Sequence, residues 1–300
     1  MDHTTITRPV LHPLVEQLLA DERLAAYAEA LPAPARVSEP ALPLLLAALY
    51  EQREGPLVCL LPEDADARDA AEGARWFLGD ERVALLPSRG VHWGSGLEPP
   101  PHLVGERARA LDVLAAGGLV CASAAAVAEA MPPARTRPAP LALGPTDAPG
   151  LDAVAEHLAL AGYERVDRVQ ERGHFAVRGG LVDVFPTTGR DPVRIEFFGD
   201  EIEAIRAFSP FTQRALHDLE GAVLYPAAER RLDLQERLTD EGDTAIPGDL
   251  VPPLDRAPDL VWEPEQVREV WAEEFQAKLS LKGAAELDPF PRGQEFAFEA

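Results

Sequence analysis

The sequence predicts an α/β protein in which a parallel sheet, covered by helices on both faces, is followed by a small β-rich domain. Up to about residue 131, short and wholly apolar strands alternate with helical segments, which is typical of a buried parallel sheet. From Tyr163 onward, short β-segments are separated by glycines. With 300 residues, the chain is near the size at which one core stops growing, so we expect two or three domains.

The first half contains the alternating elements. We expect helices over residues 14–31 and after Ser38, because leucines recur there at helical spacing. The later elements follow in order: strand 56–61, helix 63–78, strand 83–86, helix 105–116, strand 119–122 and helix 124–131. Glycines and prolines fill the loop over residues 88–101.

The second half changes character after residues 132–149, whose Pro, Ala and Arg content predicts an extended connector. A helix is expected over 151–161, and strands over 164–170, 174–178, 181–185, 193–198 and 202–208. Two charged helices, 229–243 and 263–277, should flank a strand at 259–262. The sequence ends in mid-pattern at residues 295–300, which we interpret as truncation. The predicted division is an α/β domain at 1–135, a linker at 136–150, the β-rich domain at 151–228, and a final, incomplete segment at 229–300.

Charge and cysteine content narrow the function classes. The chain has 51 acidic and 28 basic side chains, a net charge of −23, so only weak, sequence-independent DNA binding is expected. No apolar run approaches the roughly 20 residues that span a bilayer, and the N-terminus lacks the order of a signal peptide. The two cysteines, Cys59 and Cys121, lie within apolar runs and are expected to be buried thiols. These features predict a cytoplasmic protein without membrane contact.

A search for catalytic chemistry gives a negative result. A phosphate-binding P-loop needs glycines, a Lys and a Ser or Thr, but the only lysines are Lys278 and Lys282. Residues 35–42, where we expect such a loop, contain no glycine. The seven histidines are scattered and there is no Cys-x-x-Cys pair, so no metal site is predicted. We expect no catalytic residue, cofactor or metal.

The β-rich part offers one candidate site. Alternation along residues 193–198 places Val193, Ile195 and Phe197 on one face and Arg194, Glu196 and Phe198 on the other. In residues 174–178, Phe175 and Val177 should point inward, and His174, Ala176 and Arg178 outward. Arginine and phenylalanine on an outward face are typical of protein-binding hot spots. Alternatively, Phe198 tucks under the Gly199–Asp200 turn and the arginines form ordinary surface ion pairs.

Residues 174–186 (HFAVRGGLVDVFP), 192–206 (PVRIEFFGDEIEAIR) and 212–214 (TQR) resemble the UvrB interaction domain. That domain is shared by the excision-repair protein UvrB and the bacterial transcription-repair coupling factors, the Mfd family. Similar runs at 105–107, 162–165 and 289–296 extend the resemblance over most of the chain. The resemblance implies that residues 1–135 (domain 1A) and 229–300 (the start of domain 1B) belong to a degenerate RecA-like domain. The interaction domain, residues 151–228, would be inserted between them as domain 2. UvrB itself has a P-loop and a tyrosine-rich hairpin, whereas residues 89–104 contain no tyrosine.

The resemblance also implies a function: recruitment of UvrA in transcription-coupled nucleotide excision repair. The positions that carry the UvrA contact correspond to Arg178, Arg194 and Phe198. A full-length coupling factor would be an ATP-dependent DNA translocase that uses ATP and Mg²⁺. It would bind RNA polymerase and double-stranded DNA through regions absent from these 300 residues, so this chain alone is not expected to be an enzyme. The alternatives are a fragment of a UvrB-like ATP-dependent helicase or an independent DNA-binding module.

Overall fold

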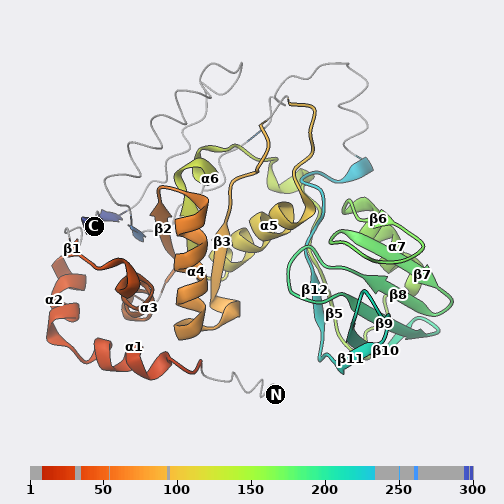
Figure 1. Cartoon of the computed structure of the whole chain (residues 1–300), viewed down its shortest axis with the longest axis horizontal. Helices are drawn as coiled ribbons and strands as arrows, with labels where there is room; N and C mark the ends of the chain where they lie inside the picture. Colours follow the sequence, from red (N-terminus) through yellow and green to blue (C-terminus); the bar gives the residue numbers. More distant parts are fainter. Residues whose placement is uncertain are drawn as a thin grey trace. The chain divides into compact units, whose positions relative to one another are not determined.

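The computed structural model describes residues 9–30, 35–53, 55–92, 95–233, 250, 260–262, 294–296 and 298–299. It divides into two compact units (Figure 1). The first contains residues 1–88, 109–130 and 251–300, and the second contains 89–108 and 131–250. The division falls inside helix α5 (Pro101–Ala115). The chain is therefore of the mixed α/β class with a parallel sheet, as predicted.

The first unit is built on a five-stranded parallel sheet in the order β14-β13-β2-β4-β3. Its strands are β2 (Leu57–Leu61), β3 (Val83–Leu86), β4 (Leu119–Ser123), β13 (Leu260–Trp262) and β14 (Gln294–Phe296). A separate parallel pair joins β1 (Ala35–Arg36) to β15 (Phe298–Glu299). The helices are α1 (His12–Leu19), α2 (Glu22–Ala30), α3 (Leu42–Arg53), α4 (Asp64–Leu78) and α6 (Ala124–Ala128).

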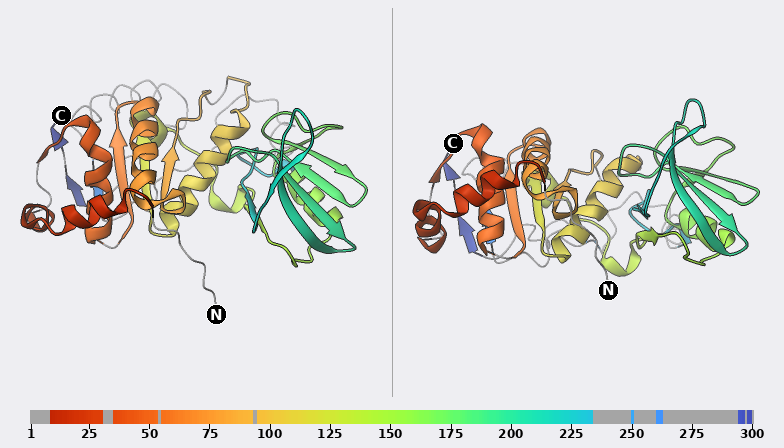
Figure 2. Two further views of the ribbon diagram at one scale, coloured as in Figure 1. Left: turned by 60° about the horizontal axis from the view of Figure 1, so that its bottom comes forward. Right: turned by 90° about the horizontal axis from the view of Figure 1, so that it is seen from below.

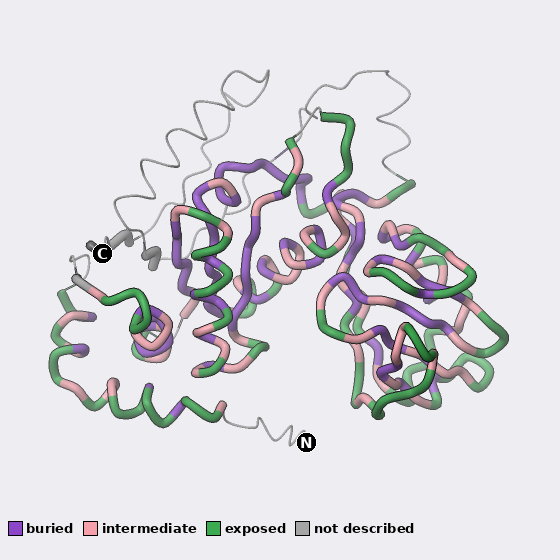
Figure 3. Tube along the Cα trace, in the orientation of Figure 1, coloured by how far each residue is buried: buried purple, intermediate pink, exposed green. Residues whose placement is uncertain are grey.

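Both faces of this sheet are buried, and each face has its own core. Alternate residues of β2, β3 and β4 pack against α1 to α4 on one side. The intervening residues pack against α5 and α6 on the other side. Figure 3 shows the central strands as continuously buried. Cys59 and Cys121 pair in register within the sheet as free thiols, and burial raises the pKa of Cys59. The strands are apolar at every position because both of their faces pack against helices, as the sequence predicted.

The helix predicted over residues 14–31 is wrong in one respect, because α1 and α2 are separate. Asp21 lies between them, and its carboxylate accepts a hydrogen bond from the backbone N–H of Arg23 at 2.9 Å. The Arg23 guanidinium also contacts this carboxylate, and these bonds lower the pKa of Asp21 to about 2. An Asp in this position caps a new helix start, which the hydrophobic spacing alone does not reveal.

A polar cluster closes the carboxyl-terminal edge of the parallel sheet. Asp64, in the first turn of α4, accepts hydrogen bonds from Ser88 N at 3.0 Å and Ser123 Oγ at 2.6 Å, as well as from Ser88 Oγ. These three residues follow or end β2, β3 and β4 respectively. Helix N-termini at this edge are the usual position for phosphate groups in α/β folds. The internal carboxylate of Asp64 lies there instead.

The expected location of the P-loop at residues 35–42 is corrected by this topology. Residues 35–36 form β1 and residues 39–41 form a 3₁₀ turn, neither of which leads from a strand of the main sheet into a helix. The strand-to-helix turn of the central strand is Pro62–Glu63, between β2 and α4. This turn also contains neither glycine nor lysine.

The second unit contains a six-stranded sheet in the order β11-β10-β9-β8-β7-β6 (Figures 1 and 2). Its strands are β6 (Glu164–Arg165), β7 (His174–Arg178), β8 (Leu181–Val184), β9 (Val193–Phe198), β10 (Glu201–Phe208) and β11 (Ala215–Asp218). Helix α7 (Leu151–Leu160) contributes Val154 and Leu158 to the core on one face. A small antiparallel pair joins β5 (Leu141–Leu143) to β12 (Ala222–Leu224), so part of the expected 132–149 connector is strand.

Close packing after α7 explains the Gly-Tyr-Glu-Arg run at 162–165. Gly162 has φ +89°, and a Cβ atom there would lie 2.3 Å from the Cβ of Ala228. The next residue, Tyr163, donates its hydroxyl to Tyr225 O at 2.6 Å, and burial raises its pKa to about 12. Glycine is therefore needed for both backbone conformation and close approach.

Several sequence-based expectations lie outside the described residues. They are the helix over 263–277 and most of the helix over 229–243. The strand predicted at 259–262 is confirmed as β13, which pairs in parallel with β2. The predicted strand over 164–170 is shorter, because β6 ends at Arg165.

Replacing Asp64 with Ala should destabilise the first unit by about 1–3 kcal/mol. The change leaves the buried Ser123 hydroxyl without this acceptor, and an unsatisfied buried donor costs that much. Thermal unfolding monitored by circular dichroism would measure the loss. The matched control is Asp66→Ala, an exposed acid in the same helical turn. Equal effects of the two substitutions would show that the cluster contributes nothing beyond a helix-dipole interaction.

Candidate functional site

The six-stranded sheet has two unlike faces. The inner face carries Phe175, Val182, Val193, Ile195 and Ile205, which form one core with α7. The opposite face carries two rows of side chains across the strands, set by the pairing register. One row runs Ala176–Asp183–Arg194–Arg206–Asp218, and the other runs Arg178–Leu181–Glu196–Ala204. We call this second side of the sheet the arginine face.

The prediction that alternate residues of β9 face the core is confirmed, with one correction. Val193 and Ile195 are buried at 6% and 0% exposure, whereas Phe197 is only half-buried against the same core. Phe197 therefore contributes less buried surface than a fully enclosed phenylalanine. The reason is its position near the end of β9, where the sheet gives way to the turn at Gly199.

Part of the arginine face is not open to solvent, contrary to prediction. Ala176 is 2% exposed and Phe208 is fully buried, and together with Val169 they form a second small core. Val166 and Phe185 pack against it. The chain after β6, predicted as strand, instead supplies two valines that cover this end of the sheet. His174 is half-buried at the margin of the same region.

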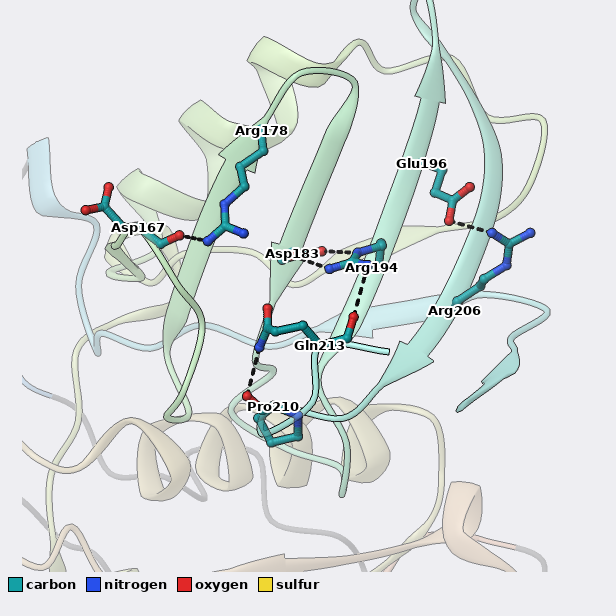
Figure 4. Close-up of polar contacts among 8 residues, drawn as sticks. All are labelled: Asp167, Arg178, Asp183, Arg194, Glu196, Arg206, Pro210 and Gln213. Atoms are coloured by element: carbon teal, nitrogen blue, oxygen red, sulfur yellow. Dashed lines mark hydrogen bonds and ion pairs between the residues drawn. The ribbon is translucent and has the colours of Figure 1, made fainter. Parts of the chain in front are cut away.

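Arg194 lies at the edge of this small core, against Phe208 on one side and Asp183 on the other. Figure 4 shows its contacts with Asp183 and Gln213. Its Nε donates to Asp183 Oδ1 at 2.6 Å and its Nη2 donates to Asp183 Oδ2 at 2.8 Å. The guanidinium carbon lies 4.9 Å from the centre of the Phe208 ring. The Asp183 side chain is 5% exposed and that of Arg194 is 19% exposed. Hydrogen bonding to Asp183 raises the pKa of Arg194, so the pair is a fixed, charged unit.

Arg206 sits directly opposite Arg194 in the ladder, an arrangement that is unfavourable for like charges. The two arginines bind different acidic side chains. Arg206 donates to Glu196 at 2.5 Å and to Asp218 at 2.8 Å, while Arg194 donates to Asp183. Both charges on this row are therefore largely compensated within the sheet.

Arg178 and Phe198 are the most accessible of the three predicted site residues. Arg178 is exposed at the end of β7, and its guanidinium donates to the backbone carbonyl of Asp167 (Figure 4). A neutral carbonyl leaves the positive charge uncompensated. Phe198 is 82% exposed, so the alternative in which it tucks under the Gly199–Asp200 turn is wrong. The other alternative, ordinary surface ion pairs, does not describe Arg194, whose pair with Asp183 is largely buried. It describes Arg206, which pairs with Glu196 and the exposed Asp218.

The three predicted residues thus share one face but differ in their exposure and in their bonding partners. Phe198 offers apolar surface, Arg178 offers a charge, and Arg194 is already engaged. Sequence reasoning missed Asp183 and Phe208, the residues that hold Arg194. The alternation of valines around Asp183 in β8 was a usable signal, because it places this acid on the outward face.

This arrangement suits recognition of another macromolecule. Among the described residues, no group of three or more His, Cys, Asp or Glu side chains could hold a metal ion. No helix in the described part of the chain is long and apolar enough to cross a membrane. An exposed phenylalanine beside fixed arginines is the composition of protein-binding hot spots.

Comparison with known families identifies the domain that carries this face. The family model described as the UvrB interaction domain matches residues 141–229. This span contains β7 to β11 and all of the arginine face. Residues 141–229 are a UvrB interaction domain. Its first strand is β5, so the small β5–β12 pair belongs to the same domain.

The curated relatives of the chain include transcription-repair-coupling factors. That of Mycobacterium tuberculosis is 38% identical over 206 residues, which is 66% of this chain and 17% of the relative. That of Myxococcus xanthus is 36% identical over 197 residues, 62% of this chain and 16% of the relative. UvrABC system protein B of Pseudothermotoga lettingae is 39% identical over 77 residues, 26% of this chain and 12% of the relative. The matched part of the chain therefore spans about a sixth of the coupling factors.

Substituting Asp183 with Ala should destabilise the interaction domain by about 3 kcal/mol. The change leaves the Arg194 guanidinium largely buried without its counter-ion, which is the costly way to break a buried pair. Asp218→Ala is the matched control, because Asp218 also binds an arginine of this face but its side chain is 83% exposed. It should cost at most about 1 kcal/mol. Chemical denaturation would measure both, and equal losses would contradict a special role for Asp183.

Proposed function

We propose that this chain is the UvrA-recruiting part of a transcription-repair coupling factor and acts in transcription-coupled nucleotide excision repair. The observation that carries the proposal is the UvrB interaction domain with Phe198 exposed on its arginine face. An 82% exposed phenylalanine at the end of an ordered strand is apolar surface that a partner can cover.

The proposed contact assigns different tasks to the three residues. Phe198 fills an apolar pocket on UvrA, and covering it excludes water from the neighbouring charges. Arg178 rotates from the Asp167 carbonyl to a carboxylate of UvrA, because a charged acceptor gives the stronger hydrogen bond. Arg194 is held flat by Asp183 and Phe208, so it supplies a preorganised surface with little entropy left to lose.

A fragment of a UvrB-like helicase is the second candidate. The coupling factors are favoured because those of Mycobacterium, Myxococcus and Bacillus match this chain over 62–68% of its length. The coupling factors of Escherichia coli and Haemophilus influenzae match over 26%, as the UvrB proteins do. The longer matches to coupling factors therefore reach beyond the interaction domain into the first unit. We propose accordingly that the first unit is a degenerate RecA-like domain into which the interaction domain is inserted.

The proposed role of the first unit does not involve nucleotide. Asp64 supplies a negative charge at the start of α4, where it accepts hydrogen bonds from Ser88 and Ser123. A phosphate at this edge would meet that carboxylate at close range, and no lysine precedes Lys278 to offset it. We therefore propose that this chain alone is not an enzyme and takes no ATP, Mg²⁺ or other cofactor.

The full-length protein is proposed to be an ATP-dependent DNA translocase that removes stalled RNA polymerase. Its contacts with RNA polymerase and double-stranded DNA would be made by regions beyond these 300 residues. Within that protein, the present chain would deliver UvrA to the stalled site in the cytoplasm.

Truncating Phe198 or Arg178 to Ala should weaken UvrA binding by about 1–4 kcal/mol without lowering the melting temperature. Both side chains are exposed, so the fold does not depend on them. Arg194→Ala should lower both affinity and melting temperature, because it leaves Asp183 buried and unpaired. Calorimetric titration of UvrA against each variant measures the affinities.

The matched control for those titrations is Val223→Ala, which removes an exposed apolar side chain from the separate β5–β12 pair. It should leave the affinity unchanged. Parent-like binding by both Phe198→Ala and Arg178→Ala would show that UvrA does not use this face.

Titration of the chain with ATP and Mg²⁺ should give neither saturable binding at micromolar concentrations nor phosphate release. The physical reason is the missing glycine–lysine cradle and the internal carboxylate of Asp64. Micromolar affinity accompanied by Mg²⁺-dependent hydrolysis would contradict the proposal.

A further inference from the structure

The loop after β10, Ser209–Arg214, carries a second exposed phenylalanine that the sequence analysis did not single out. Phe211 is 87% exposed, which is as open as Phe198 at 82%. Both belong to the interaction domain defined by residues 141–229. An ordinary loop of this length has no need of a large apolar side chain at its tip.

This loop is internally fixed. Ser209 N donates to Arg214 O at 2.9 Å and Gln213 N donates to Ser209 O at 2.8 Å. The Gln213 side chain donates through Nε2 to Pro210 O at 2.8 Å (Figure 4). Gln213 adopts φ +61°, a conformation that few residues other than glycine and asparagine take up. Phe211 therefore projects from a preformed turn and would lose little freedom on binding.

The same loop is joined to the arginine face by two arginines. Arg194, through Nη1, lies 3.5 Å from Gln213 O, so the residue held by Asp183 also contacts the loop (Figure 4). Arg168 donates to the carbonyl of Phe211 at 2.7 Å and to that of Pro210 at 3.3 Å. Arg168 comes from the segment that covers the small core of Phe208. The loop and the arginine face thus form one continuous surface.

Phe198 and Phe211 lie at opposite ends of this surface. On β9, Phe198 is four residues beyond Arg194 on the same side of the strand, a separation of about 13 Å at the usual rise per residue. Phe211 belongs to the loop at the Arg194 end, beyond the end of β10. Compact hot spots commonly contain aromatic anchors with arginines between them.

We propose that Phe211 is a second aromatic anchor for UvrA and that the UvrA-binding surface extends from Phe198 across Arg194 to the Ser209–Arg214 loop. The inference rests on the proposed function, because it names UvrA as the occupant. It adds a contact at the opposite end of the face. Arg168 acts as a positioning residue through the carbonyl of Phe211.

The test is a calorimetric titration of UvrA against the full chain carrying Phe211→Ala or Phe211→Leu, with melting temperatures recorded for each. Phe211→Ala should weaken binding by about tenfold or more, and Phe211→Leu should recover part of the loss. Neither change should lower the melting temperature, because the side chain is exposed. Val223→Ala again serves as the control for loss of an exposed apolar group.

The outcomes separate this inference from the proposed function. If Phe211→Ala binds within about twofold of the parent while Phe198→Ala binds weakly, the second anchor is wrong and the proposed function stands. If neither variant weakens binding, the arginine face is not the UvrA surface and both proposals fail. A lower melting temperature together with weaker binding for Phe211→Ala would mean that the residue is structural, which also overturns the inference.

Discussion

The arginine face depends on one largely buried ion pair, that of Asp183 and Arg194. Its two hydrogen bonds hold the guanidinium flat over Phe208, at the edge of the small second core. From that position, Arg194 also contacts the Ser209–Arg214 loop. One pair therefore links β8, β9, β10 and the loop.

The arginines of this face differ in whether their charge is compensated. Arginines in the middle of the sheet form ion pairs with acidic side chains of neighbouring strands, as Arg206 does with Glu196 and Asp218. Arg178 contacts only a neutral carbonyl at the end of β7, and Phe198 is open at the end of β9. Compensated charges shape the surface, whereas the uncompensated arginine and the open phenylalanine are available to a partner.

Local sequence pattern predicted the elements whose burial is simple. Uniformly apolar β2, β3 and β4 were correctly expected to be buried on both faces, and the alternation in β9 correctly assigned each side chain to a face of the sheet. The partner of Arg194 was not predictable in this way, because an eight-residue loop separates β8 from β9 and leaves their register open. The packing over Ala176 was not predicted for a related reason. Val166 and Val169 reach the sheet from an irregular loop, which has no regular alternation of apolar and polar residues. Non-local pairing and irregular packing decide both cases.

Hydrogen–deuterium exchange of the chain with and without UvrA tests the central claim, that the arginine face is the UvrA-binding surface, most directly. The account predicts slower exchange in β7, β9 and residues 209–214 when UvrA is present. Exchange in α7, which covers the opposite face of the sheet, should not change. Protection of α7 with unchanged exchange across β9 and the loop would contradict the account, because it would place UvrA on the other side of the domain.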